Sequence, residues 1–323
     1  MYANNKCCVR HGGQQSDWCA GKSGQRQGCT ISPLLFLIAI DCVMKRATNQ
    51  QPRETRWKAF NHLEDEDFVD DIALLSHQQK DMQEETSCVE TTARSIGLKM
   101  SHSKTKVMNT KSHSNVFTDG KSVENVIDFK YLGSYLTADG NINREISGRI
   151  VMASTAFYKL NSIWKSNRIT KDTKLKLYTS NVRSVLLYAS ETWRTNQRLK
   201  VRGGFEGWCL RGILGIRWQH RVTNKEISER TGIRPIVEEV KHRRWRWLRH
   251  VLRVSKSRHP LTALTWNPQG AGKKGRPQGT WRRSVESERV ESGKTWNELN
   301  WLAQDRCEWR KFVGALCSQE DYG

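Results

Sequence analysis

The run LEDEDFVDDIALLS at residues 63–76 constrains the fold more than any other part of the chain. Six of the eight residues at 64–71 are acidic, and Asp70 and Asp71 lie between two short apolar runs. This pattern predicts two short strands within residues 58–76, buried on either side of an acidic turn. Adjacent carboxylates repel each other, so such a pair usually needs a cation, and hard oxygen ligands suit Mg²⁺. A solvated acidic turn would produce the same pattern.

A second chemical feature is GQRQGCTISPLLF at residues 24–36, a Gly-rich stretch that runs into a helix start. Ser32 is a natural N-cap and Pro33 suits the first helical position, so residues 32–47 are expected to form a buried helix. The Gly-rich approach lets backbone come close to a ligand, and the N–H groups at the helix start could bind an anion. Many ordinary loop–helix junctions have the same pattern.

Local signals predict the remaining elements. A helical apolar stripe at residues 78–96 is followed by Gly97, which can close a helix in the left-handed conformation. Asp119-Gly120-Lys121 is typical of a hairpin turn, and residues 129–137 alternate and break at Gly133 like a tight hairpin. Short strands are also expected at 98–100 and 105–109. The helices expected after residue 140 are 141–165, 171–191, 205–215, 223–231, 236–254, 280–291 and 295–317.

The charge of the chain is divided unevenly. Residues 1–140 carry 17 Lys and Arg against 17 Asp and Glu, whereas residues 141–323 carry 37 against 16 and hold 11 of the 13 Trp. The whole net charge of +21 therefore lies in the second part, which points to a polyanionic partner. We divide the chain into an N-terminal remnant at 1–25, a first domain at 26–140 and a basic helical region at 141–323.

Other classes of protein are disfavoured by what the chain lacks. No apolar run approaches the roughly 18 residues that span a bilayer, and the N-terminus has no apolar core typical of a signal peptide. The nine Cys form no CxxC pair, which suits reduced thiols in a nuclear or cytoplasmic protein. Cys209 and His220 suggest a zinc knuckle only weakly, because no second pair has ligand spacing.

The strongest basic feature is KHRRWRWLRHVLR at residues 241–253. On a helix, Trp245, Leu248, Val251 and Leu252 fall on roughly one side, so the Trp is expected in the core and the guanidiniums at a phosphate backbone. A solvated basic face is the alternative. The arginines expected to bind nucleic acid are Arg243, Arg244, Arg246, Arg249 and Arg253. The stretch GKKGRPQGTWRR could act as a minor-groove hook through Lys273, Lys274 and Arg276, or be a flexible basic linker.

Taken in order, the motifs resemble those of a known family. RQG with SPLLF is followed by FVDD, then by a helix, KTK and the hairpin YLGSYL. Downstream come LLYASETW, CLRGILGIRWQHRVTN, RRWRWLRHVLR and GRPQGTWRR. In this series the chain resembles the reverse transcriptases of non-LTR retrotransposons (long interspersed elements), particularly the RTE-like endonuclease-reverse transcriptases.

The resemblance implies a fold, an activity and a set of site residues. The fold would be α+β, with a partial reverse-transcriptase palm followed by a mostly α-helical basic thumb and extension. The activity would be RNA-directed DNA polymerisation on an RNA template and a DNA primer or target DNA, with two Mg²⁺ clamping the attacking and leaving oxygens. Asp70 would be the catalytic, metal-binding carboxylate and Asp71 its partner. Residues lining the nucleotide and template site would be Arg26, Gln27, Gly28 and Ser32. The primer grip would be Tyr131, Leu132 and Gly133.

The departures from the family pattern also matter. The family needs a further Asp on an earlier palm strand, on a pattern like FxxAFD, and the only acid upstream of RQG is Asp17, which does not match. The fingers and the endonuclease domain are also lacking. We therefore expect this truncated chain to be inactive or nearly so as a polymerase. The alternatives are a non-catalytic, nucleic-acid-binding remnant of a degenerate element, or an open reading frame without function.

Overall fold

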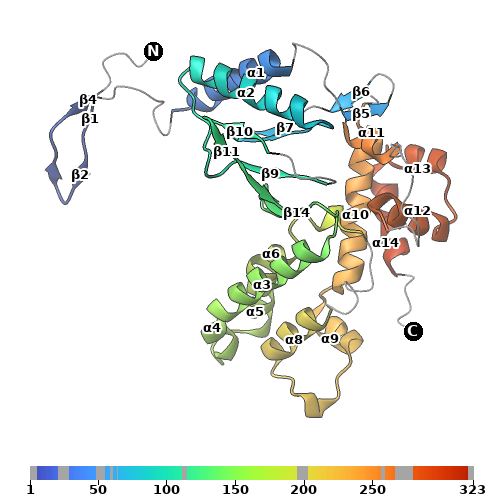
Figure 1. Ribbon diagram of the computed structural model, residues 1–323. Coiled ribbons are helices and arrows are strands. Elements are labelled where there is room, and N and C mark those ends of the chain that lie inside the picture. Colours follow the sequence, from blue (N-terminus) through green and yellow to red (C-terminus); the bar gives the residue numbers. More distant parts are fainter. Residues whose placement is uncertain are drawn as a thin grey trace. The chain divides into compact units, whose positions relative to one another are not determined.

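The computed structural model describes residues 6–20, 29–48, 55–58, 61–63, 65–110, 115–194, 203–255, 259–265 and 279–318 (Figure 1). The chain forms two compact units. The first comprises Met1–Arg56 and Asn61–Val126, and the second comprises Trp57–Phe60 and Ile127–Gly323. Helices combine with small strand pairs, so the fold is α+β, as predicted. None of the described helices is both long and apolar enough to cross a membrane.

Two helices lying side by side form the core of the first unit (Figure 1). These are α1 (Ser32–Thr48) and α2 (Gln79–Ser95), both predicted from their patterns. Residues buried between them are Val43, Met44, Ala47, Val89 and Ala93. The expectation that the first helix is buried throughout was wrong, because α2 covers only its C-terminal half in the described part of the chain. Leu34, Leu37 and Ile38 are exposed.

The strands of the first unit are short. Antiparallel pairs are β1 (Lys6–Cys7) with β4 (Cys19–Ala20), β2 (Arg10–His11) with β3 (Gln14–Gln15), β7 (Asp65–Phe68) with β8 (Asp71–Leu74), and β10 (Phe117–Thr118) with β11 (Lys121–Ser122). A parallel pair joins β9 (Lys106–Met108) and β12 (Glu124–Val126). Two further strands are β5 (Thr55–Lys58) and β6 (Asn61–Leu63). In the described part of the chain no sheet exceeds two strands, and residues 98–100 form none, so the expected palm sheet is present only as separate pairs.

The turns follow the sequence signals closely. Asp119 and Gly120 have φ values of +49° and +71°, and Leu132 and Gly133 have +47° and +82°. Two successive left-handed residues are what a type I′ hairpin turn requires, and Gly at the second position accepts that backbone at little cost. Gly97 ends α2 with φ +81°, as its position predicted. These turns are therefore encoded locally.

The second unit contains one hairpin and a set of helices. The hairpin pairs β13 (Asp128–Tyr131) with β14 (Ser134–Thr137). The α-helices are α3 (Asn143–Lys159), α4 (Asn161–Lys165), α5 (Lys171–Leu177), α6 (Ser184–Leu186), α8 (Gly203–Leu214), α9 (Asn224–Thr231), α10 (Ile236–Arg253), α11 (His259–Thr265), α12 (Trp281–Glu291), α13 (Trp296–Leu302) and α14 (Arg306–Ser318). Single turns of other helix types are η1 (Tyr178–Arg183, a π-helix), η2 (Ser190–Thr192) and η3 (Trp218–His220).

The predicted helices are confirmed with four differences. The segment predicted at 141–165 is split at Leu160 into α3 and α4. The segment predicted at 171–191 is interrupted by the π-helix η1, and α11 had no sequence prediction. The segment predicted at 295–317 is split, because the Asp305 carboxylate accepts hydrogen bonds from the N–H groups of Cys307 (2.6 Å) and Glu308 (3.0 Å) and so caps a new helix. The division into compact units places the β13–β14 hairpin with the helices, since the second unit runs from Ile127 onward. The charge pattern changes later, near residue 140.

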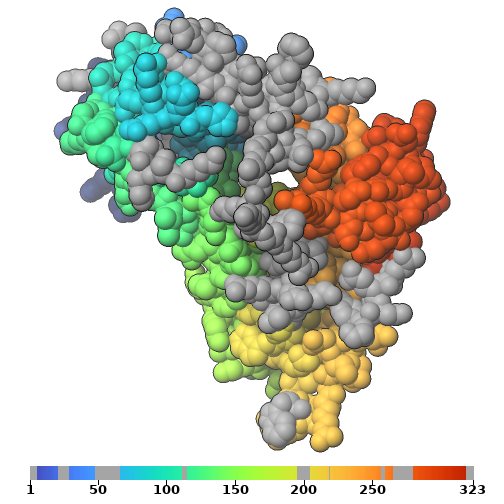
Figure 2. All heavy atoms as spheres, turned by 45° about the vertical axis from the view of Figure 1, so that its right-hand side comes forward, coloured from blue at the N-terminus to red at the C-terminus, as the bar shows by residue number. Residues whose placement is uncertain are grey.

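The helix α10 belongs to both hydrophobic cores of the second unit. Its N-terminal half contributes Ile236 and Val240 to a core built with α3, α6 and α8. Its C-terminal half contributes Trp245, Leu248 and Val251 to a second core with α11 to α14. The C-terminal helices form one continuous lobe of the surface, drawn in red in Figure 2. Trp245 is thus a core residue, as its place on the apolar side of the helix predicted.

The prediction that Arg244 binds nucleic acid was wrong, because its side chain is only 1% exposed. Its guanidinium donates to the Trp193 carbonyl through Nη2 (2.9 Å) and Nε (3.2 Å). Its Nη1 forms an ion pair with Glu288, whose other carboxylate oxygen accepts from the Trp245 indole at 2.7 Å. All these partners are internal, so no donor of Arg244 faces a phosphate.

We expect Arg244→Ala to lower the free energy of unfolding of the second unit by about 3–5 kcal/mol, because it leaves a buried carboxylate without its cation. Arg246→Ala, two residues along the same helix but exposed, should change it by less than about 0.5 kcal/mol. Intrinsic fluorescence during urea unfolding reports on this unit, which holds most of the Trp. Equal effects of the two substitutions would contradict the assignment.

The pH dependence of the Arg244→Ala variant gives a second measurement. Burial already raises the pKa of Glu288, and removing the guanidinium removes an influence that lowers it. An acid with a pKa above its unfolded value holds its proton more tightly in the folded state, so its contribution to stability is lost as pH rises through that pKa. The variant should therefore be more stable at about pH 5 than at about pH 8.

Candidate metal site and nucleic-acid surfaces

The aspartate doublet lies at a two-residue hairpin turn, as predicted. Phe68 at the end of β7 pairs with Asp71 at the start of β8, so Val69 and Asp70 form the turn. Both Asp70 and Asp71 are exposed. Exposure on a turn leaves the two adjacent carboxylates within reach of a cation and of a large ligand.

Two features of this hairpin did not follow from the sequence. Val69 has φ +61°, a conformation that is rare for a β-branched residue and that Gly favours at the first position of a hairpin turn. Such backbone costs on the order of 1–3 kcal/mol and is found most often at functional sites. The expectation that both flanking runs are buried was half wrong, since Phe68 is 61% exposed while Ile72 and Leu74 pack toward the α1–α2 core.

The donor set of the doublet suits a hard divalent cation. Mg²⁺ is commonly held by one or two carboxylates, with water and substrate phosphates completing its octahedral shell. Asp70 and Asp71 supply such carboxylates. Across the described residues, however, no three His, Cys, Asp or Glu side chains come together as a potential metal site, Cys209 and His220 included. Cys209 is instead a buried thiol whose pKa is raised to about 12, chiefly by burial.

The start of α1 is the second predicted site of the first unit. Ser32 is buried at the first residue of the helix. Arg26, Gln27 and Gly28, predicted to line the nucleotide and template site with it, lie outside the described residues. Their assignment stays a prediction.

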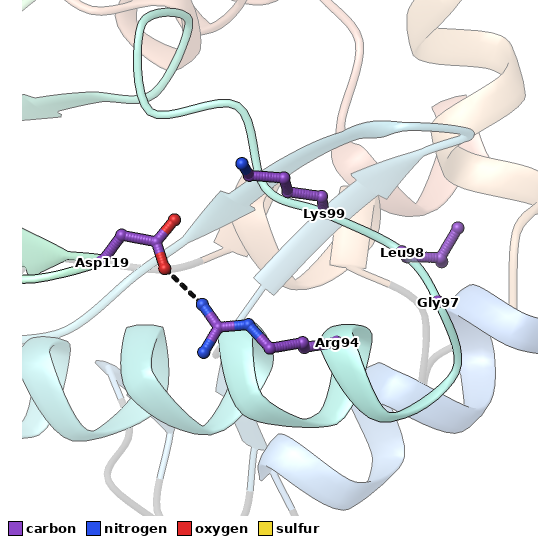
Figure 3. Close-up of a pocket in the computed structure, with 5 residues that line it drawn as sticks. All are labelled: Arg94, Gly97, Leu98, Lys99 and Asp119. Carbon is purple, nitrogen blue, oxygen red and sulfur yellow. Dashed lines mark hydrogen bonds and ion pairs between the residues drawn. The ribbon is translucent and has the colours of Figure 1, made fainter.

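A shallow pocket of about 410 Å³ lies at the C-terminal end of α2 (Figure 3). Arg94, Leu98, Lys99 and Asp119 contribute its side chains. Arg94 forms ion pairs with Asp119 and, at 2.8 Å, with Glu90, so its charge is already compensated. The pocket therefore offers an anion little beyond Lys99, and no predicted site residue lies in it.

The predicted primer-grip hairpin is held by side chains from α3 and from the turn after α6 in the second unit. The Tyr188 hydroxyl donates to the Leu132 carbonyl at 3.0 Å, and the Arg149 guanidinium donates to the Gly133 carbonyl. A Cβ on Gly133 would meet the Tyr188 ring at 3.6 Å, so the ring packs closely over the turn. These contacts to its two carbonyls fix the backbone of the turn.

Arg149 couples this hairpin to α3. Its Nε pairs with Glu145 at 2.6 Å, both side chains are buried, and its guanidinium lies 4.3 Å from the centre of the Tyr188 ring. The other Glu145 oxygen accepts from the Tyr135 N–H at 2.6 Å. Glu145, Arg149 and Tyr188 were not predicted as positioning residues. The only signal was Tyr188 within the family-like run LLYASETW.

The arginines of α10 have different environments because helical periodicity separates them. Arg246 and Arg253 are exposed, with Trp247 and His250 on the same stripe. Arg243 is half-buried and bonded to Glu239 (3.0 Å) and to the Leu187 carbonyl (2.8 Å).

Arg249 lies in a cluster of guanidiniums that the sequence analysis did not foresee. Burial lowers its pKa, and so do the nearby charges of Arg253 on α10 and of Arg306 and Arg310 on α14, with Asp305 opposing them. Four arginines from two helices thus share one region of positive potential. Lys273, Lys274 and Arg276 lie outside the described residues.

Residues 2–136 match the family model of the reverse transcriptase (RNA-dependent DNA polymerase). The matched range includes the Asp70-Asp71 turn, the start of α1 and almost all of the β13–β14 hairpin. Residues 156–188 match a domain of unknown function (DUF6451). No curated protein matches the chain. The resemblance to reverse transcriptases is thereby confirmed for the first part of the chain, and such a domain implies binding of a nucleic-acid template and primer. The retrotransposon group stays a prediction.

The Tyr188 contact can be tested by removing one oxygen. Tyr188→Phe leaves the Leu132 carbonyl without its donor and should lower the free energy of unfolding by about 0.5–1.5 kcal/mol. Amide hydrogen exchange in β13 and β14 should also accelerate. Tyr158→Phe serves as the matched control, because that hydroxyl is exposed and should contribute nothing measurable. Unchanged exchange in the hairpin of Tyr188→Phe would show that the contact does not hold the turn.

Proposed function

We propose that this chain is the palm-and-thumb part of an RNA-directed DNA polymerase from a non-LTR retrotransposon of the RTE-like group. One observation carries the proposal. An exposed pair of adjacent aspartates lies on a strained hairpin turn, inside the segment that matches the reverse transcriptase family. The motif order in the sequence supports the retrotransposon group, and the basic helical region supports a polyanionic partner.

In this proposal Asp70 and Asp71 hold divalent cations beside the growing end of a polynucleotide. Bound Mg²⁺ would stabilise the charge on the attacking and leaving oxygens of the nucleotidyl transfer. The role of the chain is positioning. The hairpin brings Asp70 in the turn and Asp71 at the start of β8 to one end of the strand pair, and the hairpin held by Tyr188 and Arg149 presents residues 131–133 as a fixed surface for a primer.

The catalytic site is incomplete in the described part of the chain. Two carboxylates of one turn leave most of the coordination shell of Mg²⁺ to water and phosphate. Among the described residues no third acidic, His or Cys side chain joins them as a metal ligand, and we propose that the chain on its own holds nucleic acid and does not extend a primer. This proposal corresponds to the non-catalytic binding function predicted as the alternative.

We expect Mn²⁺, used as a paramagnetic probe for Mg²⁺, to broaden the amide resonances of residues 69–72. Asp70→Asn should abolish the broadening because it removes one anionic ligand. Asp172→Asn, which alters an exposed aspartate at the start of α5, should leave it unchanged. Absence of broadening in the wild-type chain would remove the metal site from the proposal.

Primer extension distinguishes the complete from the incomplete site. On an RNA template with an annealed DNA primer, the purified chain should give no product with Mg²⁺. Robust extension that Asp70→Asn abolishes would confirm the chemistry and overturn the proposed inactivity. Extension that survives Asp70→Asn would indicate a contaminating polymerase, which a heat-treated control would reveal.

The nucleic-acid surface should depend on the exposed arginines of α10. Replacing both Arg246 and Arg253 by Gln should reduce the slope of log K against log salt by about 2, because each phosphate contact releases about one counterion. Lys311→Gln is the control, since that exposed lysine is already paired with Glu308 at 2.7 Å. Fluorescence anisotropy with a labelled RNA–DNA hybrid measures the slope. A slope that the double variant leaves unchanged would exclude this surface.

A further inference from the structure

An aromatic cluster lies in the second unit, where the end of α3 meets α8. Trp208 is 47% exposed and Tyr158 is 62% exposed, with ring centres 5.8 Å apart. Both rest on Phe157, which is buried and lies 5.2 Å from Trp208 and 6.4 Å from Tyr158. Trp164 stacks on the other side of Phe157 at 5.2 Å and 20°. We name the two exposed rings, Trp208 and Tyr158, the aromatic shelf. Both pack on the buried Phe157 ring.

On the face of α8 around Trp208, the Phe205 ring stacks on the Trp208 ring at 6.2 Å and 26°, and the positions four residues away are glycines. Gly204 and Gly212 lie four residues before and after Trp208, on the same side of the helix, and both are exposed. A Cβ on Gly204 would meet nothing within 4 Å, and one on Gly212 would meet only the Phe157 ring at 3.7 Å. Packing thus leaves room for larger residues at both positions. The surface beside the Trp208 ring is open to a flat ligand.

Positive charge follows Tyr158 closely in the sequence. Exposed cations lie on α3, α4 and α5 and in the turn between α4 and α5: Lys159, Lys165, Arg168, Lys171 and Lys176. Within the described chain none of these five forms an ion pair. The only acidic residue at positions 151–189 is Asp172. Exposed aromatic rings combined with cations are the means by which proteins hold single-stranded nucleic acid.

We propose that the aromatic shelf stacks unpaired bases of a single-stranded nucleic acid, while the cations on α3 to α5 hold its phosphates. The charge of this region argues against an apolar protein partner, since such a partner would leave the five cations without anionic groups to pair with. A duplex is also excluded, because its bases are already stacked. The inference rests on the proposed binding of nucleic acid by the helical region and does not depend on polymerase activity. It would give the domain of unknown function at residues 156–188 a binding role.

The test uses the full chain and fluorescein-labelled single strands of about 15 nucleotides, RNA and DNA, with a duplex of the same sequence. Trp208→Ala should weaken single-strand binding about 5- to 100-fold and leave duplex binding unchanged. Trp208→Phe should recover most of the loss because it keeps an aromatic face. Trp301→Ala is the matched control, since Trp301 is 81% exposed on α13 and should have no effect.

Two further variants guard against misfolding and separate stacking from charge. Gly212→Gln should weaken single-strand binding by blocking the shelf without removing any packed atom. Lys165→Gln with Arg168→Gln should lower the salt slope for single strands by about 1.4, or about 0.7 for each charge. Trp208→Ala should leave that slope unchanged because stacking releases no counterions.

The outcomes distinguish this inference from the proposed function. If the wild-type chain binds single strands and Trp208→Ala binds equally well, the shelf is overturned and the α10 surface is unaffected. If the wild-type chain binds no nucleic acid at low salt, both the aromatic shelf and the α10 surface are excluded as binding sites. If Trp208→Ala converts a dimer into a monomer in sedimentation while RNA affinity is unchanged, the shelf is a protein interface and the inference is wrong.

Discussion

The helical unit depends on one buried guanidinium. Burying a charge costs several kcal/mol unless its hydrogen bonds are satisfied, so Arg244 requires the Trp193 carbonyl and Glu288 to meet it together. These partners lie 51 and 44 residues away in sequence. Meeting that requirement joins α12 and the segment after η2 to α10. Because α10 spans both hydrophobic cores, the same interaction sets the positions of the exposed arginines on its other side.

In the basic run on α10, the position of each arginine on the helix determines whether its side chain is buried or exposed. Arg243 and Arg244 are adjacent in the chain, yet one is half-buried beside Glu239 and the other is enclosed in the core. Arg246 and Arg253 are exposed, and Arg249 joins Arg306 and Arg310 from α14. The overall charge predicts a polyanion-binding region, but only the packed helix tells which guanidiniums are exposed. A positive residue in a basic sequence is therefore a structural or a binding residue according to what lies across the helix interface.

Features encoded within a few residues could be predicted from the sequence. The turns at Gly120 and Gly133, the end of α2 at Gly97 and the hairpin that presents Asp70 and Asp71 depend on glycine, on alternation and on capping, all of which are visible locally. Features that depend on distant partners could not. The Tyr188–Leu132 bond spans 56 residues, and the exposure of Leu34, Leu37 and Phe68 depends on which faces the neighbouring elements leave uncovered. The π-helix could not be predicted from the periodicity of the apolar residues.

The proposed metal site has a thermodynamic consequence that follows from its small number of ligands. Two carboxylates of one turn hold a divalent cation weakly, because water must fill the remaining positions of its shell. Phosphate oxygens of a bound polynucleotide or nucleotide would replace some of those waters, so each ligand would raise the affinity for the other by the same factor. In such a site the cation is not a permanent part of the protein. It binds together with the substrate, and the strained turn at Val69 is the element whose geometry both ligands would stabilise.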